Sequence, residues 1–220
     1  MICSKLFGGA VTQKPTDFYR FDFLRGTRRV VESWIKRAWE LREVPPEDSF
    51  EPFIYTWFAF NAWAECVTGE ERDNKWVKLL ALEPTLTAGF DRWPTNRSGQ
   101  LATTLQSFRN YWPIPKMQDW RRFHLDQPSE MDRHVVAHLC IQNGIEHAPK
   151  CAKWHFDRGE DIPRDWPHFL YAVYRVRCNR FHGKKSPCDL VDQVVVQSAF
   201  KVLICFLHDG TQLTPDLRQA

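Results

Sequence analysis

Apolar side chains recur along this chain at the three- and four-residue spacing of amphipathic α-helices, and strand-like alternation is scarce. The stretches with the clearest helical spacing are 27–43, 50–67, 70–82, 98–112, 165–181 and 189–208. The second of these is apolar on nearly all sides, so we expect it at the centre of the core. The pattern predicts an all-α protein built as an antiparallel helical bundle.

Helix-breaking residues separate the first predicted helices. Pro45 and Pro46 end the helix over 27–43, Ser49 begins the next one, and Gly69 follows it. Gly26 interrupts a shorter helix that precedes them. Three further breakers predict a connector over 83–96, and they are Pro84, Gly89 and Pro94.

The region from 113 to 167 has a weaker pattern, in which only 131–141 and 151–156 predict helices. We expect one domain over residues 1–220, because 220 residues suffice for one substantial core. Its core helices lie at about 27–82 and 164–208, and an inserted helical and loop elaboration covers about 83–163.

The cysteine pattern favours a cytoplasmic protein. The seven cysteines are scattered and form no Cys-x-x-Cys pair, which is typical of reduced thiols rather than of a disulfide framework. No apolar run approaches membrane-spanning length, so we expect no membrane association. The formal charge of +3 is too small to identify a nucleic-acid binder by itself.

Two pairs of residues have the spacing of metal ligands on one helix face. His134 and His138 lie four residues apart, and so do Cys151 and His155. Neither pair has an obvious second pair with ligand spacing, so we expect no metal and no cofactor. Serine nucleophile elbows, phosphate-cradling glycine loops and dinucleotide fingerprints are absent from the sequence.

The strongest chemical signal is a group of basic residues beside a histidine at the end of the helix over 165–181. Its polar members are Arg175, Arg177, Asn179, Arg180, His182, Lys184 and Lys185, and Gly183 is placed to cap the helix. Crowded cations bind anions, and a phosphodiester is the anion for which an adjacent imidazole has chemical use.

The segment Arg177-Cys178-Asn179-Arg180-Phe181-His182 fits the pattern Arg-x4-His, followed by glycine and a basic loop. In this it resembles the HEPN (higher eukaryotes and prokaryotes nucleotide-binding) superfamily. The resemblance covers about residues 164–208, and 53–63 is similar to a packing helix of the same family. It implies a four-helix-type bundle, and it does not extend to 83–163.

Many HEPN proteins are metal-independent endoribonucleases that dimerise, so that two motifs form one composite active site. The resemblance therefore implies that His182 is the general acid or base and that Arg177 binds the phosphate and stabilises its charge. Attack by the 2′-OH of RNA would leave a 2′,3′-cyclic phosphate. The superfamily is rich in toxins and antiphage effectors, which implies an antitoxin or regulatory protein as a further partner.

The residue after the arginine departs from the family, because Cys178 stands where a polar residue is common. On a helix Asn179 lies near His182, and Arg175 lies near both. We expect these three to face the cleft, with Asn179 as a further catalytic residue and Arg175 binding substrate. Arg177 continues an apolar stripe and is expected to point into a protomer interface.

Four more side chains are candidates for substrate binding. Arg180, Lys184 and Lys185 extend the basic cluster and would contact flanking phosphates. Asn61 lies within an apolar helix, where it either makes an interhelical structural hydrogen bond or reaches the active site. The alternative to a nuclease is a non-catalytic HEPN-type module that binds RNA, a nucleotide or a protein.

Overall fold

The computed structural model describes residues 16–92, 99–181 and 190–208. Within these ranges it contains eleven α-helices, one short 3-10 turn and one two-stranded sheet, which confirms the all-α class. In chain order the helices are α1 (Tyr19–Phe23), α2 (Arg25–Glu40), α3 (Phe50–Thr68), α4 (Asp73–Ala81), α5 (Pro84–Arg92), α6 (Gly99–Arg109), α7 (Met117–Arg122), α8 (Arg133–Gln142), α9 (Ala152–Phe156), α10 (Trp166–Phe181) and α11 (Leu190–His208).

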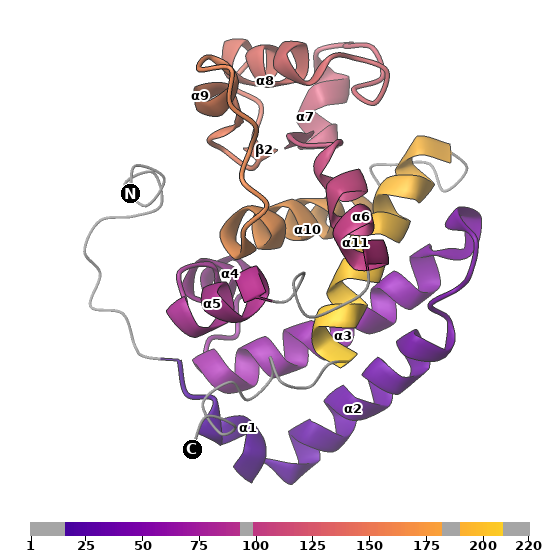
Figure 1. The fold of residues 1–220 in the computed structure, drawn as a ribbon, viewed down its shortest axis with the longest axis vertical. Helices are drawn as coiled ribbons and strands as arrows, with labels where there is room; N and C mark the ends of the chain where they lie inside the picture. The colour runs from indigo at the N-terminus through magenta and orange to yellow at the C-terminus, as the bar shows by residue number, and fades with distance from the viewer. Residues whose placement is uncertain (1–15, 93–98, 182–189, 209–220) are drawn as a thin grey trace.

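Helix α3 lies at the centre of the core, as its sequence predicts. It packs against α2, α4 and α11, while α10 packs against α4 and α5 (Figure 1). The large side chains Phe53, Trp57, Phe60 and Trp63 are at most 1% exposed. Each burial of this kind stabilises the fold by about 1.5–3 kcal/mol, so α3 organises the helices around it.

The predicted helix ends are close to the observed ones, with one exception near the start of the described chain. Gly26 lies inside α2, and the break from α1 falls at Leu24 instead. Helix α3 ends at Thr68, and Gly69 caps it in the left-handed conformation with φ of 65°. Glycine suits this position because it has no Cβ to clash with the backbone.

The predicted connector over 83–96 is wrong for the residues that form α5. Pro84 occupies the first helical position, where a missing N–H leaves no hydrogen bond unmade. Leu86 and Phe90 from this helix are fully buried in the main core. Tertiary packing therefore outweighs the breaking tendency of Pro84 and Gly89.

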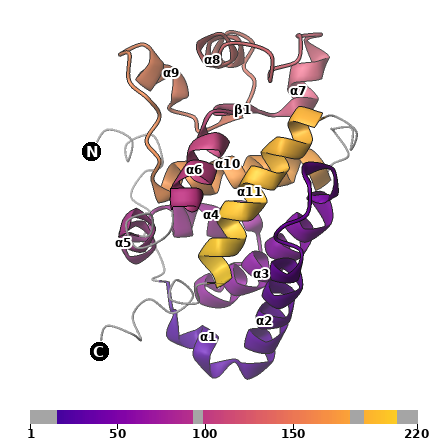
Figure 2. The same cartoon turned by 45° about the vertical axis from the view of Figure 1, so that its right-hand side comes forward.

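A second, smaller apolar cluster lies beyond α10. Its buried members are Met117, Trp120, Val136, Cys140 and Ile145. Strand β1 (Ile114–Pro115) pairs antiparallel with β2 (His147–Ala148) beside it. Helices α7, α8 and α9 gather at this end of the molecule, opposite α1 and α2 (Figures 1 and 2). The separate cluster thus begins at Met117, because α5 and α6 contribute to the main core.

One expectation about apolar segments is wrong. Residues 191–208 of α11 form an 18-residue segment long and apolar enough to cross a membrane. In the structure 67% of this segment is buried among the other helices. A core helix of a soluble protein meets the same length and composition criteria, so the segment is weak evidence for a membrane span.

Candidate functional site

Helix α10 carries the basic motif and is fixed along its length by burial. Asp165 precedes it and accepts a hydrogen bond from the backbone N–H of His168 at 3.1 Å, which satisfies one free donor at the helix start. Phe169, Val173 and Val176 lie in the core. His182, Lys184 and Lys185, together with Gly183, lie outside the described residues.

The side chain of Arg177 is directed to α4. Its Nη1 lies 3.0 Å from Oδ2 of Asp73, whose Oδ1 accepts a hydrogen bond from the hydroxyl of Tyr174 at 3.1 Å. The guanidinium carbon lies 5.7 Å from the ring centre of Trp57 and 4.9 Å from that of Phe181. Burial, Cys178 and Asp73 raise the pKa of Tyr174, so its hydroxyl stays protonated and donates to Asp73.

Arg177 and Asn61 line one pocket, although 116 residues separate them in the sequence (177 minus 61). The pocket has a volume of about 490 Å³. Its lining residues come from α3, α4, α10 and the segment before α4, and they are Asn61, Glu65, Glu71, Arg72, Asp73, Asn74, Tyr174 and Arg177. It therefore combines two guanidinium groups with three carboxylates.

The interhelical hydrogen bond considered for Asn61 is not the one formed. Its Nδ2 donates to Oε1 of Glu65 at 2.9 Å, one turn along the same helix. The side chain is partly exposed in the pocket that Arg177 lines. The amide therefore makes its hydrogen bond within α3 and lines the same pocket as Arg177.

The opposite face of α10 carries Arg175 and Asn179, and it is covered by the sheet. Nη2 of Arg175 lies 3.1 Å from Oε2 of Glu146. Asn179 is 3% exposed; it donates to the carbonyl of Pro115 at 2.9 Å and accepts from the N–H of Met117 at 3.1 Å. The prediction that Asn179 faces an open cleft is wrong, because β1 occupies that face.

Aromatic side chains lie exposed near the end of α10. Phe58 and Phe181 are 40% and 38% exposed, and their ring centres lie 6.5 Å apart. Arg180 extends past the ring of Phe50, with its guanidinium carbon 5.9 Å from the ring centre. We call Phe50, Phe58 and Phe181 the aromatic patch. It adjoins the pocket through Phe181, which Arg177 also contacts.

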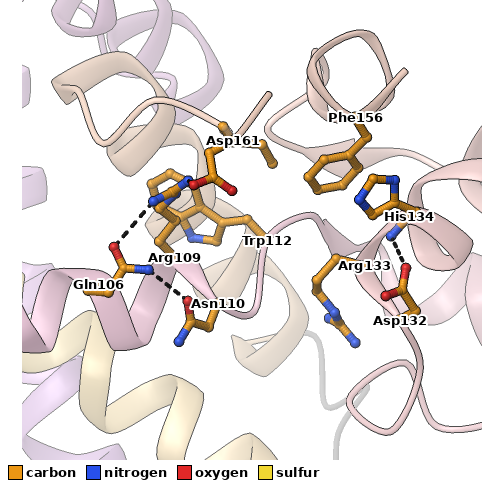
Figure 3. Close-up of a pocket in the computed structure, with 10 residues that line it drawn as sticks. Gln106, Arg109, Asn110, Trp112, Asp132, Arg133, His134, Phe156 and Asp161 are labelled. Atoms are coloured by element: carbon orange, nitrogen blue, oxygen red, sulfur yellow. Dashed lines mark hydrogen bonds and ion pairs between the residues drawn. The ribbon is translucent and has the colours of Figure 1, made fainter. Parts of the chain in front are cut away.

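A second pocket, of about 380 Å³, lies between α6 and α8 (Figure 3). Gln106, Arg109 and Asn110 border one side of it, and Arg133 and His134 border the other. The guanidinium groups of its two arginines already bind other groups of the protein. Arg109 pairs with Asp161 at 2.6 Å, and Arg133 donates to the carbonyls of Met131, Pro128 and Tyr111.

The two ligand-spaced pairs have different surroundings. His134 and His138 are exposed on α8, and the ring of His134 stacks on Phe156 with centres 4.4 Å apart. Cys151 and His155 are buried, and the first turn of α10 brings His168 to them. In the part of the chain that the structure describes, these last three form the only group of potential metal ligands.

Each histidine of this group has a carboxylate at its Nδ1 side. Nδ1 of His168 contacts Oδ1 of Asp165, and Nε2 of His168 lies 2.9 Å from Sγ of Cys151. Nδ1 of His155 lies 3.4 Å from Oε2 of Glu160 without hydrogen-bond geometry. Burial lowers the pKa of His155, with Glu160 acting in the opposite direction, so burial favours a neutral ring.

No protein-family model matches the chain. No curated protein and no solved structure matches it either.

The sequence shows the ligand spacing of Cys151 and His155, but no metal was expected there, and His168 and the carboxylate of Asp165 that orients it were not identified. One signal was present: Asp165 and His168 lie three residues apart at a helix start, where both side chains share a face. Because His168 lies far from Cys151 and His155 in the sequence, their spacing does not reveal the cluster.

Proposed function

We propose that this chain is a metal-independent endoribonuclease of the HEPN type, with its active site at the end of α10. The observation that carries the proposal is the pocket shared by Arg177 and Asn61. Arg177 is the arginine of the Arg-x4-His motif, and His182 follows five residues later. The reaction comes from the superfamily resemblance, and the pocket beside Arg177 supports this location for it.

The residue types suit RNA cleavage by the neighbouring 2′-OH. The 2′ oxygen bonds to phosphorus and gives up its proton, the bond from phosphorus to the 5′ oxygen breaks, and that oxygen takes a proton. His182 serves one of these proton transfers, and Arg177 stabilises the charged phosphorane. Asp73 and Tyr174 hold the guanidinium in a fixed orientation, which lowers the cost of ordering it during reaction.

The three carboxylates of the pocket oppose phosphate binding, so further cations are needed. Arg180, Lys184 and Lys185, which follow Arg177 in the sequence, are the candidates. A homodimer would add a second set and would cover the exposed aromatic patch. We therefore propose a composite active site between two copies, open to inhibition by an antitoxin or another regulatory protein.

The test is to incubate the purified full-length chain with RNA in EDTA, with circular dichroism before and after to verify the fold. We expect cleavage that leaves 2′,3′-cyclic phosphate ends. His182→Ala and Arg177→Ala should each reduce the rate by at least about 100-fold, the usual contribution of a proton-transfer or charge-stabilising group. Arg121→Ala, an exposed arginine on α7, is the matched control and should cleave like the unsubstituted chain.

A second candidate is a non-catalytic module that binds RNA, a nucleotide or a protein. The engagement of Arg175 and Asn179 in contacts with the sheet favours it, because fewer polar groups remain for catalysis. Intact RNA after incubation with a folded dimer would support this candidate and contradict the nuclease. Growth arrest on expression that His182→Ala relieves is expected only of the nuclease.

A further inference from the structure

Cys151, which precedes α9, and His155 on α9 meet His168 on α10, although no sequence motif links them. Their potential ligand atoms all lie within 4.8 Å of one another, and all three residues are buried. Tetrahedral zinc, with bonds of about 2.3 Å to sulfur and 2.0–2.1 Å to nitrogen, holds its ligands about 3.3–3.6 Å apart. Movements of about 1 Å or less would bring the three atoms to that spacing.

The carboxylates beside the histidines match the surroundings of a metal site. A histidine that binds a metal through one ring nitrogen usually presents the other to a carboxylate or carbonyl. Asp165 contacts Nδ1 of His168, and Glu160 lies beside Nδ1 of His155. Nε2 of His155 is buried and has no hydrogen-bond partner, an arrangement that costs free energy unless a ligand occupies it.

We propose that Cys151, His155 and His168 bind one zinc ion, with Asp165 and Glu160 as supporting carboxylates. One thiolate and two imidazoles form a donor set that suits Zn²⁺ among the common divalent ions, and a water molecule completes the tetrahedron. The ion joins α9 to the first turn of α10 and closes the segment 157–165 between them. It stabilises the folded state, because the unfolded chain lacks the assembled site.

The contact from Cys151 through His168 to Asp165 also has the order of an activated thiol nucleophile. Such a thiol must meet a substrate, whereas Cys151 is 2% exposed. A metal ion with one bound water molecule needs far less room than a substrate. The burial of the cluster thus favours the zinc site.

This zinc site is separate from the proposed nuclease site. His168 and Arg177 are nine residues apart on α10 (177 minus 168), or about 14 Å along its axis. The zinc proposal does not depend on RNA cleavage, since its measurements are metal content and affinity. EDTA would remove a zinc ion that stabilises the fold, so the RNA assay in EDTA includes a check of the fold.

The experiment uses the full-length chain, free of any polyhistidine tag and purified from zinc-supplemented medium. Inductively coupled plasma mass spectrometry should find about one zinc per chain. After chelation, Co²⁺ should give the visible absorption of a tetrahedral site with a thiolate ligand. Added Zn²⁺ should also raise the melting temperature of the apoprotein.

Variants identify the ligands. Cys151→Ser, His155→Gln and His168→Gln should each abolish stoichiometric zinc binding, because each removes one of the three protein ligands. Asp165→Asn keeps all three ligands and a good helix cap, and it should weaken binding by about 10–100-fold. This variant tests the site without removing a ligand that folding requires.

Buried residues outside the cluster provide matched controls. Cys140→Ser and His147→Gln should retain the zinc content and affinity of the unsubstituted chain. The proposal is overturned if the unsubstituted chain carries no more zinc than Cys151→Ser. Equal affinities for ligand and control variants would overturn it as well.

Discussion

Asn179 acts, in this structure, as a clamp between α10 and the sheet. Its amide is the hydrogen-bond partner of both the Pro115 carbonyl and the Met117 N–H. Asn179→Ala leaves two buried backbone groups unpaired, so we expect the free energy of unfolding to fall by about 2–4 kcal/mol. Urea unfolding followed by circular dichroism measures the change.

Asn61→Ala is the matched control for this substitution. Its hydrogen bond to Glu65 is local and partly exposed, so the free energy of unfolding should change by no more than about 0.5 kcal/mol. Equal urea midpoints for Asn179→Ala and the unsubstituted chain would show that the clamp is not needed for stability.

At this scale, the sequence located the basic cluster but not the partners of its members. Arg175 and Arg177 differ by two residues, or about 200° around a helix, so their separation onto two faces follows from spacing. Which face of α10 is covered depends on the position of β1 and β2. Strands of two residues each are too short to show an apolar alternation in the sequence. Asp73, the carboxylate that holds Arg177, lies far away in the sequence and has no local signature.

At the scale of whole elements, the long periodic segments were predictable, whereas only some of the short ones, such as α4 and α9, were. Helices α2, α3, α10 and α11 have many turns over which an apolar face repeats, and their predicted and observed ends nearly coincide. Helices α5 and α7 have nine and six residues, respectively. In so few turns, a proline or an ambiguous pattern outweighs the period, and only tertiary packing decides the outcome.

Gly69, which caps α3, should be sensitive to substitution. Gly69→Ala places a Cβ at a φ of 65°, which costs an L-residue about 1 kcal/mol or more, so the free energy of unfolding should fall by that amount. Gly26→Ala is the control, since Gly26 lies in α2 and a Cβ there would meet nothing within 4 Å. It should be neutral or stabilise by up to about 1 kcal/mol. Paired urea titrations compare the two, and a loss at Gly26 alone would contradict the assignment of the cap.

At the scale of the whole molecule, α10 packs against helices of the main core and against the sheet, and the two candidate sites lie toward its opposite ends. Its first turn contributes His168 to the Cys151 cluster, and its last turns contribute Arg177 to the pocket with Asn61. The amphipathic pattern of α10 could be predicted from the sequence, but these tertiary contacts of His168 and Arg177 could not. They depend on how α3, α4 and α9 pack against it.

The aromatic patch is the surface through which we expect two copies of the chain to dimerise. Phe58 is 40% exposed and contacts Phe181, so an apolar surface lies beside the pocket of Arg177. If two copies meet there, Phe58→Glu places a charge in the interface and should weaken dimerisation by at least about 10-fold. Sedimentation velocity should then find the 26.0 kDa monomer at concentrations where the unsubstituted chain is a dimer.

Phe123→Glu is the matched control, because Phe123 is 43% exposed, follows α7 and is not part of the aromatic patch. It should leave the dimer and RNA cleavage unchanged, whereas Phe58→Glu should reduce cleavage in proportion to the loss of dimer. Because a composite site needs both copies, raising the concentration of Phe58→Glu until it dimerises should restore its activity. A monomeric Phe58→Glu chain that cleaves at the full rate would show that one copy suffices.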